Sequence, residues 1–228
     1  MVQPFPAHKL GPYLEQIALT QPLVQRITFC PNDWNTLPLQ PALSQLQNST
    51  EIIANGYITR GDVTKVGNLA VSERLGWDAF FVSVMIWGFG TVGYGRWRTE
   101  QMMATQDFNN IFNNIRTNIL LGAIAQAYGA PRINRCGPPF LTKILYFLGK
   151  VFCTTNPLPL ILDSRVVASL TKCNGNGFAA TNYYRTNASG RYLQGYIDYC
   201  NDLHSWSQEH NFRPDQLELF LFCPPVGF

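Results

Sequence analysis

A lysine and an aspartate, twenty positions apart, are the residues of this sequence best suited to chemistry. Lys143 follows the run Gly137-Pro138-Pro139-Phe140-Leu141-Thr142, and Asp163 follows the run Pro157-Leu158-Pro159-Leu160-Ile161-Leu162. A neutral lysine can attack the anomeric carbon of a sugar and form a Schiff base. An aspartate within reach can accept a proton, or can stabilise the cation-like sugar while its glycosidic bond breaks. The pair therefore indicates chemistry on a sugar.

The surroundings of Lys143 decide whether it can be a nucleophile. A lysine attacks only when it is neutral, and burial or a nearby cation lowers its pKa toward that state. Phe140 could exclude water from the site, and Arg135 and Arg165 are cations close in the sequence. Taken singly, a helical lysine is most often a solvated charge, and an aspartate at a helix start is most often a cap. The two interpretations of Asp163 are compatible, because a capping side chain can also face a reacting group.

Acidic residues avoid the middle of the chain. Residues 91–191 contain eleven lysines and arginines but three acids, and Asp163 is the single carboxylate between Asp107 and Asp198. This segment carries +8, so the rest of the chain carries −5, because the whole chain carries +3. Such asymmetry is typical of a face that binds phosphates, and a basic surface kept for solubility is the alternative. An acid that persists in such a segment is expected to have a function.

Composition limits the class of protein. With 228 residues, 46% of them hydrophobic, the chain can form one domain or two lobes that share a core. No apolar run is long enough to span a membrane, so no membrane partner is expected. The six cysteines are dispersed, and with three scattered histidines they lack the spacing of a zinc or iron–sulfur site. We therefore expect a reduced, cytoplasmic protein that holds no metal and no cofactor.

Proline and capping signals predict the elements around the pair. Proline is favoured in the first turn of a helix, so Pro138 is expected to begin a helix that runs to about Phe152. The prolines of residues 157–162 enforce extended backbone at their neighbours. Asp163 is then expected to cap a helix that continues through about Lys172, because its side-chain oxygen can accept the free N–H groups of the first turn.

The rest of the chain is predicted to be mostly helical, from apolar residues at helical spacing and from caps and prolines. Helices are expected over about Leu10–Ile27 with a break or bend at Pro22, Pro41–Leu46, Ala79–Trp87 with Asp78 as its cap, Asp107–Ala127, Ser189 to about His210, and Pro214 to about Cys223. Gly93-Tyr94-Gly95-Arg96-Trp97-Arg98 is expected to be a loop, because its glycines interrupt a helix. The predicted fold class is mainly α.

These residues carry a resemblance to a known family. A helix that begins at Gly137-Pro138-Pro139 and contains Lys143, followed by the proline-containing run that ends at Asp163, resembles the helix-hairpin-helix DNA glycosylases. Trp87-Gly88-Phe89-Gly90 and Leu162-Asp163-Ser164-Arg165-Val166 are similar to a compact prokaryotic branch with the 8-oxoguanine DNA glycosylase fold. The resemblance covers about residues 77–172. It implies a two-lobed helical fold with a central cleft, in which residues 1–65 and 163–228 form one lobe and residues 66–162 form the other.

The resemblance also implies roles for individual residues. Lys143 matches the family's Schiff-base lysine, and Asp163 matches its catalytic aspartate. In the family a Gly-x-Gly hairpin grips DNA phosphate through backbone N–H groups, but here Gly137-Pro138-Pro139-Phe140 stands in its place, and prolines have no N–H. Arginines or a threonine near the hairpin could replace that grip. The candidate DNA contacts are Arg96, Arg98, Arg132, Arg135, Thr142 and Arg165.

An enzyme of this kind extrudes its target nucleotide and recognises the base by stacking and by hydrogen bonds to its edge. Phe89, Tyr94 and Trp97 are the candidate base-pocket residues, because glycines and arginines surround them in a predicted loop, where binding residues concentrate. Trp87, Phe178 and Trp206 are further candidates for stacking, and Tyr57 is a candidate wedge, although each type of residue is more often part of a core.

The leading hypothesis is a monomeric DNA glycosylase that acts on double-stranded DNA containing a modified base. It would leave an abasic site, either with or without associated AP lyase activity. Its role would be either repair of oxidised bases or antiphage defence, in which hypermodified (for example glucosylated) phage bases are excised. The first alternative is a non-catalytic DNA-binding module with the same fold. The second is a helical interaction domain that binds no nucleic acid.

Overall fold

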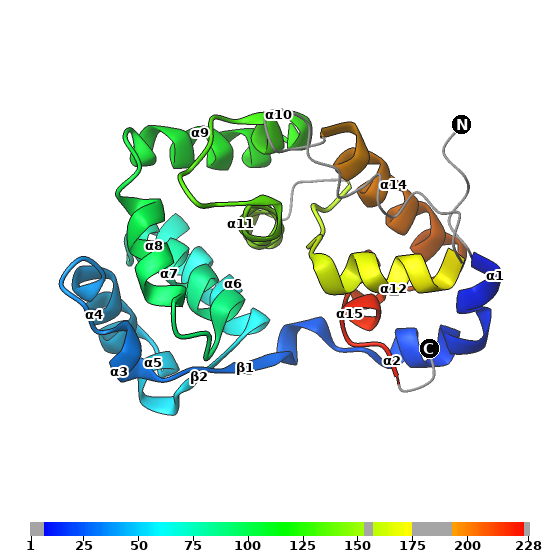
Figure 1. The fold of residues 1–228 in the computed structure, drawn as a ribbon, viewed down its shortest axis with the longest axis horizontal. Coiled ribbons are helices and arrows are strands. Elements are labelled where there is room, and N and C mark those ends of the chain that lie inside the picture. The colour runs from blue at the N-terminus through cyan, green and yellow to red at the C-terminus, as the bar shows by residue number, and fades with distance from the viewer. Residues whose placement is uncertain (1–6, 153–156, 175–192, 226–228) are drawn as a thin grey trace.

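The computed structural model describes residues 7–152, 157–174 and 193–225, and helices dominate it (Figure 1). The mainly α fold class predicted from the sequence is confirmed. The one sheet in this part of the chain has two short antiparallel strands, β1 (Arg26–Thr28) and β2 (Tyr57–Thr59), with Ile27 opposite Ile58. No helix among the described residues is long and apolar enough to cross a membrane.

The N-terminal residues form short elements instead of the single helix expected over Leu10–Ile27. They are α1 (Ala7–Leu10), η1 (Gly11–Tyr13), α2 (Leu14–Leu19) and η2 (Pro22–Val24), followed by β1. The prediction of one helix was wrong because a proline in the first turn of η1 and another in that of η2 each start a new short helix.

The middle of the chain builds a helical body around α7. Its elements are α3 (Pro31–Trp34), α4 (Gln40–Ser49), α5 (Ile52–Asn55), α6 (Arg60–Val71), α7 (Trp77–Phe89), α8 (Gly95–Met103), α9 (Phe108–Leu120) and α10 (Ile124–Gly129). Helix α7 is apolar nearly all round and packs against α4, α6, α8 and α11, which is why almost all its side chains are buried.

Three local predictions in this body were wrong. Asp78 is not the cap of α7, because the capping position is Gly76 and Asp78 lies in the first turn. The expected loop at residues 93–98 becomes helical from Gly95, whose backbone lies against Phe89. The single helix expected over Asp107–Ala127 is divided into α9 and α10, and Gly122 adopts a positive φ of 74° between them.

The helices that flank the Lys143–Asp163 pair begin where the sequence predicts. These are α11 (Pro138–Phe152) and α12 (Ser164–Asn174), and the predicted helix from Pro214 is α15 (Pro214–Phe222). Helix α14 (Leu193–Glu209) lies within another predicted helix, whose expected cap, Ser189, is outside the described residues.

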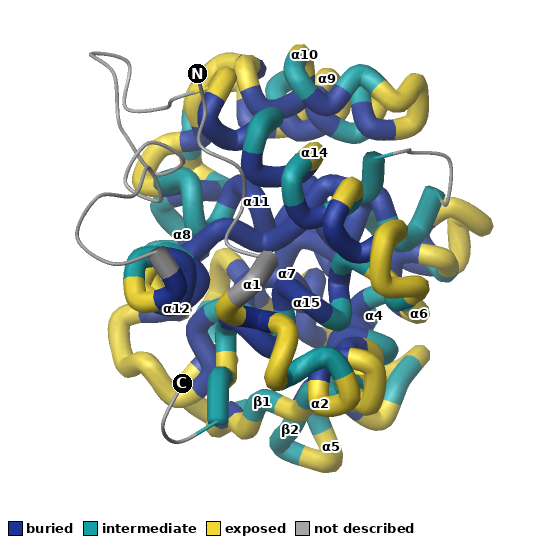
Figure 2. The backbone as a smooth tube through the Cα atoms, turned by 90° about the vertical axis from the view of Figure 1, so that its right-hand side faces the viewer, coloured by how far each residue is buried: buried dark blue, intermediate teal, exposed yellow. Residues whose placement is uncertain are grey.

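Helix α11 runs through the middle of the molecule. Figure 1 shows it end-on, between the body around α7 and a second group of helices, and Figure 2 shows that α7 and α11 are mostly buried. The second group contains α12, α14 and α15 together with the N-terminal α1 and α2, since α15 packs on α2 and α12 packs on α1. We propose this grouping as the division into lobes. It places the boundary near Gln25 and not near residue 65, because α4 and α6 pack on α7.

Candidate active site

Lys143 and Asp163 meet in the structure. The Nζ atom of Lys143 lies 3.4 Å from Oδ2 of Asp163 and 3.2 Å from the carbonyl oxygen of Pro139, to which it also donates. Lys143 is 5% exposed and Asp163 is 8% exposed. The two residues that the sequence singled out therefore form a nearly buried ion pair, with Lys143 on α11 and Asp163 directly before α12.

The other oxygen of Asp163 caps α12. Its Oδ1 accepts hydrogen bonds from the backbone N–H groups of Arg165 at 2.9 Å and Val166 at 3.3 Å. The N-terminus of a helix favours a negative charge, so the cap holds the carboxylate in place. With Oδ1 on the helix and Oδ2 on Lys143, Asp163 both caps α12 and faces the lysine.

The extended segment before Asp163 is fixed at successive residues. The N–H of Leu162 donates to the Thr142 hydroxyl at 3.1 Å, and that hydroxyl lies 3.3 Å from the Leu162 carbonyl oxygen. The hydroxyl of Tyr199 donates to the carbonyl of Ile161 at 2.8 Å, and that of Tyr196 donates to Leu160 at 3.0 Å. Thr142 precedes Lys143 and Leu162 precedes Asp163, so the contact between them sets the spacing of the reacting groups.

The side chain of Lys143, on α11, lies against Gly88 of α7 and the ring of Phe140. A Cβ atom on Gly88 would be 3.2 Å from Cδ of Lys143 and 3.2 Å from a ring carbon of Phe140, so glycine makes room for the lysine. The ring of Phe140 lies 5.4 Å from Nζ. Burial lowers the pKa of Lys143, although the charge of Asp163 opposes this shift. Desolvation thus favours the neutral, nucleophilic amine.

A second buried ion pair, which the sequence did not indicate, lies beside the first. Arg60 on α6 and Glu218 on α15 are fully buried and joined by two hydrogen bonds of 2.5 and 3.2 Å. The charges of both act on Lys143, and burial raises the pKa of Glu218. The guanidinium of Arg60 also lies 5.0 Å from the ring centroids of Trp87 and Tyr146. No spacing rule links positions 60 and 218, so only the fold reveals this pair.

Three of the candidate DNA contacts gather at the start of α11. Arg98, Arg132 and Arg135 line a hollow of about 360 Å³ together with Gly137 and Pro138. The Nε of Arg98 donates to the backbone carbonyl of Arg135 at 3.0 Å, and Arg135 itself has a positive φ of 58°. A basic hollow thus occupies the region in which proline removes the backbone donors.

The remaining candidate DNA contacts lie apart. Arg96 is exposed and donates to the backbone carbonyl of Asp33 at 3.2 Å. Arg165 is exposed in the first turn of α12, with its guanidinium 5.0 Å from the ring of Phe222. Thr142 is fully buried and bonded to Leu162, an arrangement that does not favour a DNA contact.

Two of the candidate base-pocket residues, Tyr94 and Phe89, form a row of aromatic rings with Phe140, which lies beside Lys143. Phe89 is buried and stacks on Phe140 at 4.2 Å between ring centroids, and Tyr94, which is exposed, meets Phe89 edge-on at 5.9 Å. Trp97 is exposed, and the guanidinium carbon of Arg135 lies 4.5 Å from the centroid of its ring. Phe89 is therefore part of the core, while Tyr94 and Trp97 are accessible.

The other aromatic candidates differ in their surroundings. Trp87 is buried beside Phe147, with ring centroids 5.3 Å apart. Trp206 on α14 is buried against His210 and Phe212, which lie in the turn that follows this helix. Tyr57 belongs to β2 and is covered by Arg26 at 3.7 Å, and Phe178 lies outside the described residues.

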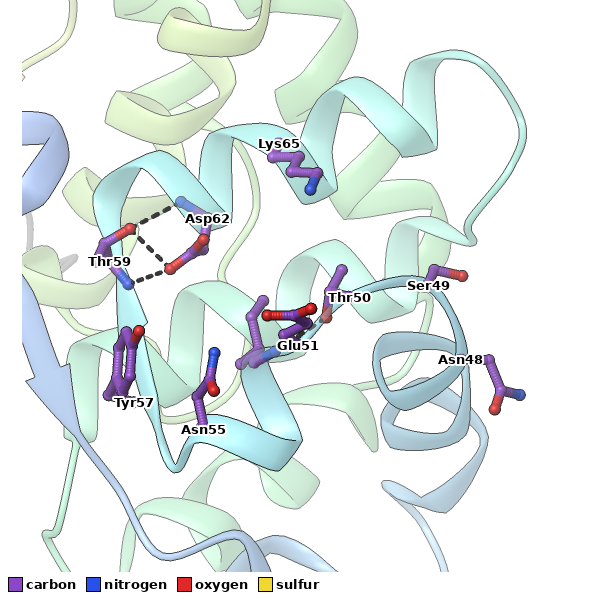
Figure 3. A pocket seen from close by; sticks show the side chains of 10 residues that line it. Asn48, Ser49, Thr50, Glu51, Asn55, Tyr57, Thr59, Asp62 and Lys65 are labelled. Atoms are coloured by element: carbon purple, nitrogen blue, oxygen red, sulfur yellow. Dashed lines mark hydrogen bonds between the residues drawn. The ribbon is translucent and has the colours of Figure 1, made fainter.

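Figure 3 shows a separate polar hollow of about 590 Å³, lined by residues of α4, α5, β2 and α6. Its wall includes Thr59 and Asp62, which bond to each other as the capping box of α6. These carboxylate and hydroxyl oxygens are thereby used to begin a helix, and neither Lys143 nor Asp163 lines the hollow. Among the described residues, no group of histidine, cysteine and acidic side chains could hold a metal ion.

The structure combines a mainly helical fold, a nearly buried lysine–aspartate pair and a basic hollow at the start of the helix that carries the lysine. These features agree with the resemblance to the helix-hairpin-helix DNA glycosylases. A family model described as "Putative 8-oxoguanine DNA glycosylase OGG-like protein" matches residues 20–222. The match covers most of the chain, so this protein belongs to that family, and the resemblance drawn from the sequence is confirmed. Neither a curated protein nor a solved structure matches the chain significantly.

Proposed function

We propose that this protein excises a modified base from double-stranded DNA, with Lys143 as the nucleophile and Asp163 as its acid–base partner. The observation that carries the proposal is the distance of 3.4 Å between Nζ and Oδ2 in a nearly buried site, where burial lowers the pKa of the lysine. A solvated surface lysine would have neither the contact nor the shift. Membership of a DNA glycosylase family supports the same function.

The chemistry begins when the electron pair of neutral Nζ forms a bond to C1′ of the extruded nucleotide. The glycosidic bond breaks, and its electron pair leaves on the base, which takes a proton from solvent. Asp163 stabilises the cation-like sugar and accepts a proton from the attached nitrogen. The sugar ring then opens: the C1′–O4′ bond breaks, O4′ takes the proton back from Asp163, and a protonated Schiff base forms between C1′ and Lys143. In an AP lyase reaction Asp163 would next accept a C2′ proton, and the electron pair of that C–H bond would form a C2′–C3′ double bond as the 3′ phosphate leaves with the electron pair of its bond to C3′.

The basic hollow gives the DNA a place to bind near this centre. Arg98, Arg132 and Arg135 surround the start of α11, the helix that carries Lys143. Contacts to phosphate fix the position of the duplex and carry no sequence information, so selectivity must come from the extruded base. A DNA strand bound at this hollow would lie at the start of the helix that carries Lys143, so the sugar of its extruded nucleotide could reach the lysine.

Borohydride trapping tests the proposal. The protein is incubated with duplexes that each contain one modified base from a panel, including oxidised bases, and separately with phage genomic DNA. Borohydride then reduces any Schiff base to a stable adduct. We expect an adduct with at least one substrate, and its loss in Lys143→Gln. Lys65→Gln, which changes an exposed lysine on α6, is the matched control and should trap as well as the unchanged protein.

The outcomes separate the possible mechanisms. Base release that survives Lys143→Gln but not Asp163→Asn would mean that water is the nucleophile and that the enzyme is monofunctional. Release that survives both substitutions would refute the assignment of the site. Salt-dependent DNA binding without release of any base would favour a non-catalytic DNA-binding module.

A further inference from the structure

Trp87 on α7 contains a buried hydrogen-bond donor without an acceptor. The residue is 3% exposed, and its indole Nε1 has no hydrogen-bond partner among the described residues. Buried polar groups in native proteins are nearly always paired, and an exception calls for an explanation. A tryptophan can only donate, so the missing partner must be an acceptor.

The residue next to Trp87 in the sequence and the ring that Trp87 meets both belong to the surroundings of Lys143. On α7, the following residue is Gly88, whose missing side chain makes room for Lys143. On α11, the Trp87 ring meets Phe147 edge-on at 5.3 Å between centroids, and Phe147 is four residues after Lys143. Trp87 is therefore connected to the surroundings of Lys143 through both α7 and α11, which makes it a candidate to meet a base attached to the attacked sugar.

The buried ion pair holds the Trp87 ring without using its N–H. The guanidinium of Arg60 lies 5.0 Å from the ring centroid, a distance at which a cation is attracted to the ring face. The donors of Arg60 are directed to Glu218 and to Gln25, at 2.5 to 3.2 Å. The carboxylate of Glu218 is thereby satisfied by Arg60, and the indole donor stays available for a ligand.

We infer that Trp87 determines which base is excised, by donating a hydrogen bond from its indole N–H to the extruded base. The base must present an acceptor at this point, either a ring carbonyl oxygen or an unprotonated ring nitrogen. A base with an amino group there is rejected, because two donors would face each other. A site that hydrogen-bonds its substrate discriminates far more sharply than an apolar one. This inference rests on the proposed glycosylase function and names the chemical class of its base.

The test compares two substrates that differ only in the presence of the base. One duplex contains an excised base found in the trapping panel, and the other contains an abasic site, which needs Lys143 but no base recognition. With Trp87→Phe we expect release of the base to fall by about tenfold to a hundredfold, as for a lost buried hydrogen bond. Trapping on the abasic duplex should stay within about twofold of the unchanged protein, as should both activities of Trp77→Phe, the matched control on the same helix.

A second measurement keeps the unchanged protein and alters the base. Analogues of the excised base, each with one acceptor replaced by hydrogen, should include one that is released more slowly by the same factor. Trp87→Phe should not distinguish that analogue from its parent, because the two changes remove one hydrogen bond. This comparison measures the bond even if Trp87→Phe is poorly stable.

Three results would overturn the inference. Equal base release by Trp87→Phe and the unchanged protein would do so, and so would the absence of any sensitive analogue. An equal loss of both activities in Trp87→Phe would mean that the ring only supports the fold. The unchanged protein could trap abasic DNA in a Lys143-dependent way and yet release all the analogues at the same rate. That result would support Lys143 as the nucleophile and refute only the role of Trp87.

Discussion

The hydroxyl of Thr142 offers a direct test of how the two reacting residues are held together. Thr142→Val keeps the size and shape of the side chain but removes the group that meets Leu162. Leu162 is fully buried, so its N–H would lose its acceptor without gaining water. A buried donor left unsatisfied costs about 1–3 kcal/mol, so the free energy of unfolding should fall by about 2 kcal/mol.

The effect on activity should exceed the effect on folding. Without this contact, the segment that carries Asp163 is free to move relative to Lys143, and a displacement of ~1 Å in an active site can cost about a hundredfold in rate. We therefore expect single-turnover base release to fall by about tenfold to a hundredfold. Affinity for DNA should not change, because the hydroxyl is buried.

Urea denaturation measures the first effect, and rapid-quench assays with excess protein measure the second. Thr171→Val is the matched control, because the Thr171 hydroxyl donates to Val167 within α12 at 2.8 Å and links no second segment. The reasoning fails if Thr142→Val is as stable and as active as Thr171→Val. Weaker DNA binding with unchanged stability would instead assign Thr142 to the DNA contacts.

Three further perturbations probe the surroundings of the lysine. Burial lowers the pKa of Lys143, and the neutral amine is the proposed nucleophile. Trapping on abasic DNA should therefore rise with pH and level off below the ordinary lysine pKa of 10.5. A rise that continues through pH 10.5 would contradict a desolvated lysine. Gly88→Ala should reduce trapping without loss of stability, since its methyl group meets the lysine stem while alanine favours the helix by about 1 kcal/mol. Gly129→Ala, a helical position where nothing lies within 4 Å, should not lower stability either but should leave trapping unchanged. Glu218→Gln should lower the free energy of unfolding, measured in urea, by about 3–5 kcal/mol, because it leaves Arg60 buried without its counter-charge. The double variant Arg60→Met with Glu218→Leu should recover much of this loss. Equal or greater destabilisation by the double variant would refute this expectation.

The parts of the fold that the sequence predicted depend on short-range signals. Pro138 begins α11 because proline fits only the first turn of a helix, and Asp163 caps α12 because its side chain reaches N–H groups two and three residues ahead. These two signals, with Lys143 between them, were sufficient to identify the central pair. The same kind of signal misled at Gly95, where packing against Phe89 favours a helix over the loop that glycines suggest.

The parts that could not be predicted depend on contacts between distant residues. Tyr199 holds the carbonyl of Ile161, and Arg60 pairs with Glu218, across separations of 38 and 158 residues. Tyrosine and arginine at those positions have no local pattern that indicates a partner, because the partner is chosen by how the helices pack. Trp87 was recognisable as an aromatic candidate, but its unpaired N–H is a property of the folded interior alone.

Helix α15 lies near the end of the sequence, so it is synthesised after the residues with which it forms ion pairs. It supplies Glu218 to Arg60 and Asp215 to Lys150, whereas Lys143 is made 75 residues before Glu218. A chain still growing on the ribosome holds Lys143 and Asp163 but lacks the carboxylates of α15, so Arg60 has no counter-charge. If the proposed function holds, the active centre should therefore mature only when α15 docks, and a fragment that ends before Pro214 should excise no base.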